Sequence, residues 1–386
     1  MKVQQIPLLI LSISASLQGI EALSLSTSPS ESAKLAKYRL QESLSSISGK
    51  LTLSPEIVLP EPNDPTALLL QASEVTKLST RIRTSAKANA AWVAGSLNTL
   101  KSFCAEQETA RGNFPGPVPV IFCDSAFNSG SEDKDENSNI RPEISELAQA
   151  GVSGLLSCVL GGKEISSVDE IETDEELGAA FASAIENGIQ LIPEVVLSPE
   201  KKWSEEDVTS LVEAVCTKCG GDEDPACIVL TVNPSQDNDD DSESNASDEN
   251  DEEELLLPIV SKEIKKRLPI LGSVRALAGG NRMGSAVADL KKAGFTGAFL
   301  RSDCVPGFRM NPDLDFVGGF WSAAIGDLKS TKSKNFNFRS KVQLDRDIPL
   351  EWYNYQKDVM ESGALGSPGG GGPDPLDTDN GDYQGF

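Results

Sequence analysis

The sequence predicts an α/β fold with a parallel sheet, and three observations support this prediction. The 386 residues are enough for one large domain. Short apolar runs of the kind that form strands buried on both faces recur along the middle of the chain, and segments of helical periodicity separate them. Strands of this kind that alternate with helices of about ten residues form βα units. The six predicted strands are residues 118–123, 154–160, 190–197, 226–232, 268–274 and 297–300.

The predicted helices favour a barrel. They are residues 143–150, 174–186, 205–216 and 284–293, with one more at 313–324. A closed barrel needs eight strands and roughly 250 residues. Residues 51–58 and 90–95 are the candidates for the two strands still to be found, and a shortened or open barrel is the alternative. We therefore predict a TIM-type (β/α) barrel, either complete or irregular.

The rest of the chain surrounds this barrel. Residues 64–110 have helical spacing and predict a helical N-terminal extension. Two polar insertions, residues 128–139 and 237–254, follow the C-terminal ends of predicted strands. The second is too acidic to bury a core and is expected to be a disordered loop. The expected organisation is a signal peptide at 1–22, a transit-like segment at 23–41, a mainly helical extension at 42–115, the barrel at 116–310, a C-terminal extension at 311–365 and a disordered tail at 366–386.

Composition excludes several classes of function. The net charge of −25 disfavours DNA and anionic membrane surfaces as partners, because both would be repelled. The chain has no histidine, which removes the Ser–His–Asp and Cys–His systems and every histidine-bearing metal site. Proton transfer would fall to Asp, Glu, Lys, Cys or Tyr. Cys216, Cys219 and Cys227 leave a zinc site one ligand short, so we expect structural thiols, no metal and no cofactor.

The N-terminus predicts export. Lys2 precedes an apolar run at 6–17 and a small residue, Ala22, at a plausible cleavage point. The run is too short to span a bilayer, so no stable membrane insertion is expected after processing. Residues 23–41 are rich in serine and basic residues, and they resemble the transit part of the bipartite presequences of algae with secondary plastids. The expected location is therefore a plastid, and secretion or the endomembrane lumen is the alternative.

Several segments resemble indole-3-glycerol phosphate synthase, an aldolase-class barrel that binds a phosphorylated substrate. Residues 114–124 resemble the first strand and loop of that family, and residues 140–160 its first helix and second strand. The clearest match runs from Leu-Pro-Ile-Leu-Gly-Ser-Val-Arg at 268–275 to residues 289–303, and it resembles strand seven, the next helix and strand eight. Residues 191–196 and 228–233 resemble strands five and six. The resemblance covers about residues 64–305.

The resemblance also implies a site. Glu194 falls on the fifth-strand glutamate of the family, and Asp124 replaces a lysine at the end of the predicted first strand, so both are candidate catalytic groups. Gly272 replaces the seventh-strand glutamate, and no counterpart of the third-strand lysine is found. The candidate substrate-binding residues are Asn233 and Ser273. The candidate phosphate-binding residues are Gly279, Gly280, Arg275 and Arg301.

Two functions follow from these departures. The loss of the lysines predicts a plastid barrel without lyase activity, which acts as a binding or assembly factor and contacts a plastid protein through its C-terminal extension. A phosphorylated small molecule is its expected ligand. The alternative is a divergent indole-3-glycerol phosphate synthase, a carboxy-lyase of tryptophan biosynthesis, or another phosphosugar enzyme. Lys163 or Lys201 would then have to reach Glu194. Trp352, Tyr353 and Tyr355 either pack back on the barrel or contact a partner.

Overall fold

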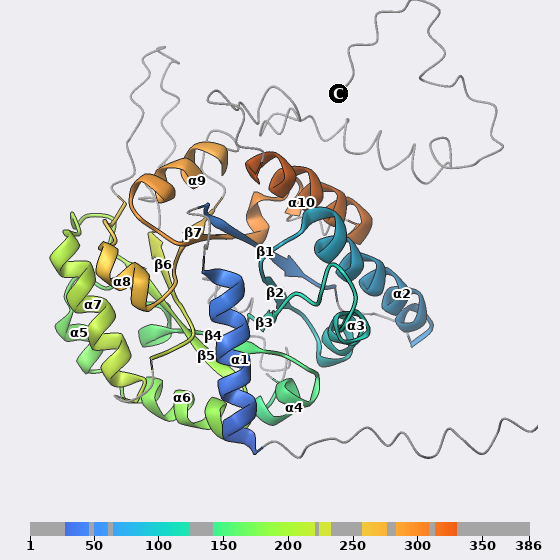
Figure 1. Cartoon of the computed structure of the whole chain (residues 1–386), viewed down its shortest axis with the longest axis horizontal. Coiled ribbons are helices and arrows are strands. Elements are labelled where there is room, and N and C mark those ends of the chain that lie inside the picture. The colour runs from blue at the N-terminus through green and yellow to red at the C-terminus, as the bar shows by residue number, and fades with distance from the viewer. Residues whose placement is uncertain are drawn as a thin grey trace, which may run out of the picture.

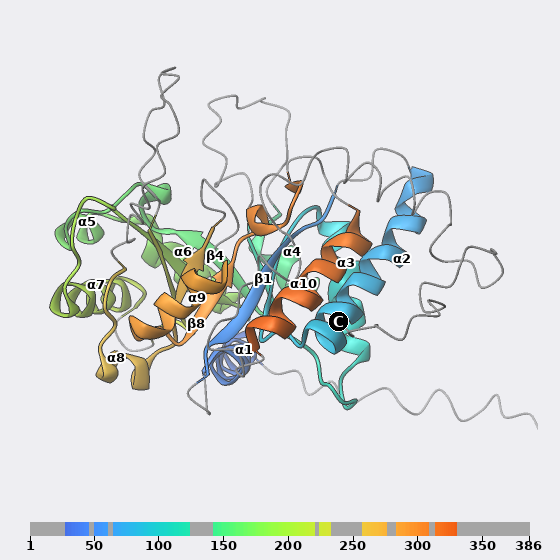
Figure 2. The same cartoon turned by 90° about the horizontal axis from the view of Figure 1, so that it is seen from above.

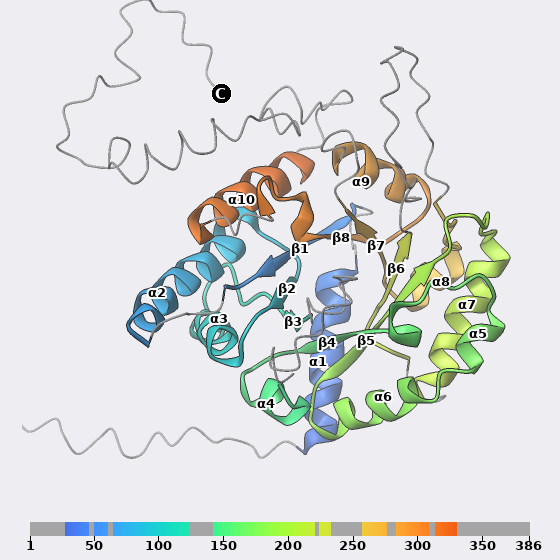
Figure 3. The same cartoon turned by 180° about the vertical axis from the view of Figure 1, so that it is seen from behind.

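The computed structural model describes residues 28–45, 50–60, 65–123, 142–220, 224–232, 257–275, 283–308 and 313–329. Eight parallel strands follow one another around a closed barrel in chain order, and the eighth pairs with the first (Figures 1 and 3). The predicted TIM-type barrel is confirmed, and it is closed. The strands are β1 (Thr52–Val58), β2 (Ala91–Ala94), β3 (Val120–Phe122), β4 (Gly154–Cys158), β5 (Gln190–Leu197), β6 (Ile228–Val232), β7 (Ile270–Val274) and β8 (Gly297–Leu300).

Helices surround the barrel between successive strands. They are α2 (Pro65–Arg81) with the π-helical turn η2 (Ile82–Ala86), α3 (Leu97–Thr109), α4 (Ile144–Gln149), η4 (Val159–Gly162), α5 (Asp169–Glu172), α6 (Glu176–Glu186), α7 (Glu205–Lys218), α8 (Lys262–Arg267), α9 (Met283–Lys292), η5 (Ser302–Cys304) and α10 (Leu314–Lys329). The last of these packs against α2 and η2 and so completes the ring after β8. Among the described residues, no helix combines the length and the apolar character that a membrane crossing needs.

The structure differs from the expectation at the start of the barrel. The segments compared with the first and second strands of the synthase are β3 and β4, and the true first strands are β1 and β2. Residues 42–115 are therefore the first part of the barrel wall. The reason is visible in β1, where Thr52, Ser54 and Glu56 alternate with apolar residues and so hide the strand among polar positions. The four-residue β2 is too short to stand out.

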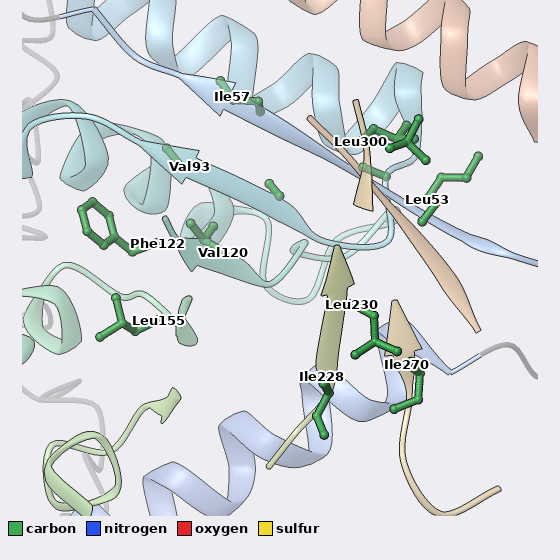
Figure 4. Packing of buried hydrophobic residues seen from close by; sticks show 14 of the residues in the cluster. Leu53, Ile57, Val93, Val120, Phe122, Leu155, Ile228, Leu230, Ile270 and Leu300 are labelled. Carbon is green, nitrogen blue, oxygen red and sulfur yellow. The ribbon is translucent and has the colours of Figure 1, made fainter. Parts of the chain in front are cut away.

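Two apolar layers hold the barrel together. The outer layer joins strand residues to the helices around them, and Figure 4 labels some of its members, including Leu53, Val120 and Ile228. The inner layer fills the barrel itself with side chains that alternate with the outer ones along each strand. Trp92 and Phe299 meet there with ring centroids 4.4 Å apart. The barrel is therefore a packed core and not a channel.

A helix that the sequence did not predict, α1 (Pro29–Leu44), closes the N-terminal end of this core. Figures 1 and 2 show it lying across the ring of strands, at the end where the strands begin. Ser28 caps it, because its hydroxyl accepts a hydrogen bond from the Glu31 amide while the Glu31 carboxylate accepts one from the Ser28 amide. Leu40 and Leu44 are fully buried and belong to the inner layer.

Residues at or just before the starts of β1, β2 and β5 contact α1 directly. Hydrogen bonds from the side chains of Thr52, Asn89 and Gln190 reach carbonyl oxygens of the helix, at 3.2, 3.1 and 2.9 Å. At Gly188, which has a φ of +81°, a Cβ would lie 3.1 Å from the Cβ of Ser32. Residues 29–41 of the transit-like segment are thus a built part of the folded domain, and this differs from the expectation for residues 23–41.

The burial of Leu40 leads to a stability test. We expect Leu40→Ala to lower the free energy of unfolding by about 2–5 kcal/mol, because it leaves a cavity between α1 and the barrel interior. Urea denaturation measures this. Leu35→Ala, at a half-exposed position of the same helix, is the control and should change stability by less than about 0.5 kcal/mol. Equal effects of the two changes would show that α1 does not close the barrel.

Candidate functional site

Strand alternation brings a polar layer to the C-terminal end of the barrel. Inward-facing positions are apolar in the middle of the barrel and become polar near the strand ends. Glu56 comes from β1, Glu194 from β5 and Ser273 from β7, and Arg301 directly follows β8. The three charged side chains are buried. We call Glu56, Glu194 and Arg301 the charge network.

Arg301 lies at the centre of the charge network. One of its terminal nitrogens makes a close ion pair with Oε1 of Glu194, and the other lies 3.5 Å from Oε1 of Glu56. Its Nε donates a hydrogen bond of 3.0 Å to the hydroxyl of Ser273. The guanidinium carbon lies 4.3 Å from the centroid of the Phe299 ring, which forms the floor of the site. Within the described residues, the guanidinium therefore contacts side chains of the barrel wall.

Neutral donors complete the contacts of both carboxylates. The amide and the hydroxyl of Ser302 each donate to Oε2 of Glu56 at 2.9 Å. The hydroxyl of Thr231 donates to Oε1 of Glu194 at 2.6 Å. Burial alone would raise the pKa of Glu194, but the Arg301 cation and the Thr231 hydrogen bond outweigh burial, and the pKa lies below its usual value. Glu194 is thus a stable anion at neutral pH.

Two cysteine thiols lie against the carboxylates. Cys123 donates to Oε1 of Glu56 at 3.7 Å, and Cys158 donates to Oε2 of Glu194 at 3.5 Å. Burial, together with the charge of Glu194, raises the pKa of Cys158 to about 12. Burial and the charge of Glu56 also raise the pKa of Cys123. Both thiols therefore stay protonated, and they act as weak hydrogen-bond donors rather than as nucleophiles.

The structure brings together three residues that the sequence singled out, namely Glu194, Ser273 and Arg301. Arg275 comes directly after β7. Its positive charge contributes to the lowered pKa of Glu194 and offsets part of the rise in the pKa of Cys158. Its Nε is buried and has no hydrogen-bond partner among the described residues. The other four candidates lie outside the described residues, and their roles stay predictions; they are Asp124, Asn233, Gly279 and Gly280.

Sequence reasoning missed Glu56, Thr231, Ser302 and the two thiols. Glu56 had a usable signal, because it occupies the same alternating set as Thr52 and Ser54 and so faces inward once β1 is recognised. Thr231 also faces inward, near the end of β6, two residues after the buried Val229. A hydroxyl or thiol on a strand carries no sequence signal that separates a partner of a buried charge from ordinary core packing.

The remaining candidates lie elsewhere. Lys163 lies 3.5 Å from a carboxylate oxygen of Glu170, and Lys201 lies 3.6 Å from one of Asp207, so the described structure pairs both lysines with outer acidic residues. Burial raises the pKa of both Cys216 and Cys219 to about 12, as expected for structural thiols. Within the described ranges, no group of three or more metal-ligating side chains occurs.

Charge balance limits what the site can bind. The charge network holds two carboxylates and one guanidinium, so it carries an excess negative charge that faces Arg275. A phosphate that drew Arg301 away from Glu56 and Glu194 would leave two buried carboxylates unpaired, which costs several kcal/mol. Arg275 is not tied in this way within the described structure. Phosphate binding by these two arginines stays a prediction, and Arg275 is the better placed of them.

The fold and the site define an α/β barrel protein of the TIM type with an ionic network at its C-terminal end. The chain matches no protein-family model and no curated protein. Among solved structures it is similar to triosephosphate isomerase from Bartonella henselae, with 11% identity, 70% of this chain and 98% of that chain covered, and a TM-score of 0.33.

Two other barrels are similar to the same extent. A 2,3-dimethylmalate lyase of the PEP mutase/isocitrate lyase superfamily has 12% identity over 86% of this chain and 99% of its own, with a TM-score of 0.33. A Schiff-base-forming fructose-1,6-bisphosphate aldolase has 12% identity, with 76% of this chain and 99% of that chain covered and a TM-score of 0.37. Likeness at this level carries no argument about activity, and the strand order of the chain itself establishes the barrel.

Removal of the central cation tests the charge network. We expect Arg301→Met to lower the free energy of unfolding by about 3–5 kcal/mol, because it leaves two buried carboxylates without their counter-ion. Chemical denaturation measures the loss. Arg267→Met is the matched control, since it breaks the exposed pair with Asp224, and it should cost at most about 1 kcal/mol. A loss of similar size in both variants would contradict the arrangement.

The lowered pKa of Glu194 predicts how stability changes with pH. The unfolded chain, with a glutamate pKa of about 4.3, takes up the proton before the folded chain does. The contribution of Glu194 is therefore present above that pH and is lost as the pH falls through the lower folded pKa. We expect Glu194→Gln to flatten the acid limb of the unfolding free energy against pH. Glu200→Gln, at an exposed position beyond β5, should keep the wild-type slope, and an unchanged slope in both would refute the assignment.

Proposed function

We propose that this barrel lacks indole-3-glycerol phosphate synthase activity and serves as a binding or assembly factor. The observation that supports the proposal is the locked state of Arg301 between Glu56 and Glu194. An acid–base enzyme needs a group that gains and loses a proton near the working pH. Glu194 is held as an anion, and the neighbouring thiols stay protonated, so none of these three groups meets the requirement.

The lysines support the same conclusion. The parent reaction of the resembling family depends on a lysine acid, and the two lysines that could replace it, Lys163 and Lys201, pair with Glu170 and Asp207. A barrel whose central arginine is paired internally retains a rigid frame for presenting its loops and terminal segments. Partner binding through the residues beyond α10 is the function that such a frame serves in this proposal.

A divergent phosphosugar enzyme is the second candidate, and Arg275 is the observation that favours it. Its buried Nε lacks a partner among the described residues, and its charge acts on Glu194. A phosphate of a substrate would satisfy this nitrogen by a charge-assisted hydrogen bond. Asp124 and Asn233 would then supply the remaining polar groups of the site.

We also propose a plastid as the location, reached by a leader that ends before Ser28. The plastid rests on the resemblance of the N-terminus to bipartite presequences. The fold of α1 supports the end of the leader, because cleavage inside α1 would remove residues that are buried against the barrel. Export without a plastid, by secretion, is the alternative. N-terminal sequencing of the processed protein separates a start before Ser28 from one within α1.

Calorimetric titration with inorganic phosphate and with an anthranilate-type ribulose phosphate analogue tests the absence of synthase activity. For the chain that begins at Ser28 we expect no binding of the analogue at micromolar concentrations, and no growth of a tryptophan auxotroph that lacks the synthase. Rescued growth would refute the proposal. Micromolar binding that is lost in Arg275→Ala but kept in Arg267→Ala would favour the phosphosugar enzyme, because only the first arginine faces Glu194.

A further inference from the structure

We propose that the N-terminal end of the barrel is a docking surface for the C-terminal segment of the same chain, with the aromatic residues Trp352, Tyr353 and Tyr355 as the docked group. This end is opposite the charge network, so the proposal stands whether or not the network binds a ligand. It assigns a binding site to a part of the barrel that the proposed function does not use. A partner of the C-terminal extension would have to displace the aromatic residues from this site or contact other residues of the extension.

Some large hydrophobic side chains near this end are exposed to solvent. Among the described residues the large hydrophobic side chains that stand in solvent are Leu35 (48% exposed), Tyr38 (63%), Phe114 (100%) and Ile259 (52%). Leu35 and Tyr38 lie on α1, one helical turn apart. Phe114 is in the segment that leads into β3. Ile259 precedes Val260, whose amide donates to Ala293 just before β8 begins. Of the four, Leu35 and Tyr38 are neighbours on one helix, and none of the four lines the cleft described next.

A cleft of about 760 Å³ opens at the same end. It lies between the end of α1, one side of α3 and the segments that enter β3 and β4. Its lining includes apolar residues such as Ala105, Pro117 and Val118, and Arg39 and Lys101 line it as well. Neither of these two cations has an ion-pair partner in the described part of the chain. The volume is in the range that holds drug-sized ligands, which is enough for an aromatic pair of side chains.

The helix α10 ends at the same side of the barrel. The side-chain amine of Lys329, the last residue of α10, donates to the carbonyl oxygen of Lys87. Two residues further on, Asn89 donates to the carbonyl oxygen of Ser43, which lines the cleft. Figure 2 shows α10 ending at the side of the barrel where α1 lies. Lys329, the last described residue of the chain, therefore lies at the end of the barrel that holds the cleft.

The sequence beyond α10 contains a group that fits. Residues 351–355 read Glu-Trp-Tyr-Asn-Tyr and include three aromatic side chains. Residues 330–350 are 21 residues long, and a chain of that length with random-coil dimensions spans about 25 Å, so the barrel end is within reach. Asp345, Asp347 and Glu351 are complementary to the charge of the cleft, where Arg39, Lys101 and Arg111 outnumber Glu42 and Glu108. Tethering adds a high effective concentration, so a modest contact is enough to keep the segment bound.

Tryptophan fluorescence of the full chain tests the docking. Trp92, Trp203 and Trp321 are buried, so subtracting the spectrum of Trp352→Phe isolates the fourth tryptophan. We expect the Trp352 emission to be shifted to the blue and its quenching by acrylamide to be several-fold weaker than in a free peptide of residues 343–362. Ala105→Glu places a charge at an exposed position of the cleft and should raise the quenching to the level of the peptide.

Asn98→Glu is the matched control, because Asn98 is exposed on the same helix and does not line the cleft. It should leave Trp352 protected. Quenching at the level of the free peptide in the unchanged chain would overturn the proposal. Protection that rises with protein concentration would also overturn it, since the occupant would then be the segment of a second copy. Protection that Ala105→Glu does not relieve would place Trp352 elsewhere on the barrel and would refute this site.

Discussion

A buried guanidinium between two carboxylates is the constraint on which the C-terminal end of the barrel depends. Glu56 and Glu194 come from β1 and β5, strands that lie across the barrel from each other, and Arg301 pairs with both. Each carboxylate also receives a hydroxyl hydrogen bond, from Ser302 or from Thr231. Buried charges survive only when such partners are complete, so the position of any strand that supplies one is fixed by the others. Ion pairs thus connect β1, β5 and the end of β8 at the C-terminal end of the barrel, where the inner layer is no longer apolar.

The apolar pattern of the chain was enough to predict most of the barrel. The runs that became β5 to β8 were strongly apolar or closely framed by helices, and periodicity locates such runs well. β1 was a weak candidate because three of its seven residues are polar and face inward, where a soluble sheet normally has apolar side chains. The helix α1 was read as part of a leader, because its serines and basic residues on the exposed side hide the burial of Leu40 and Leu44.

The candidate site was accessible in part, through resemblance and not through pattern. Matching strands five, seven and eight located Glu194, Ser273 and Arg301, and the structure brings their side chains together. The sequence did not show that Arg301 is paired with two buried carboxylates. Arg301 was predicted to bind phosphate, and the structure shows that the carboxylates of Glu56 and Glu194 already pair with it. Pairing between strands 245 residues apart leaves no local signal.

The closing helix α1 also has a consequence for the time at which the protein folds. It is the first of the described elements to leave the ribosome, yet three of its partners, Gly154, Gly188 and Gln190, are made more than a hundred residues later. Contacts of such long sequence separation form late, because the intervening chain has to be ordered first. During synthesis α1 therefore lacks its contacts with β4 and β5 until those strands have been made. The N-terminal end of the barrel can be closed by α1 only after β5 has been made, although α1 itself is synthesised before every strand of the barrel.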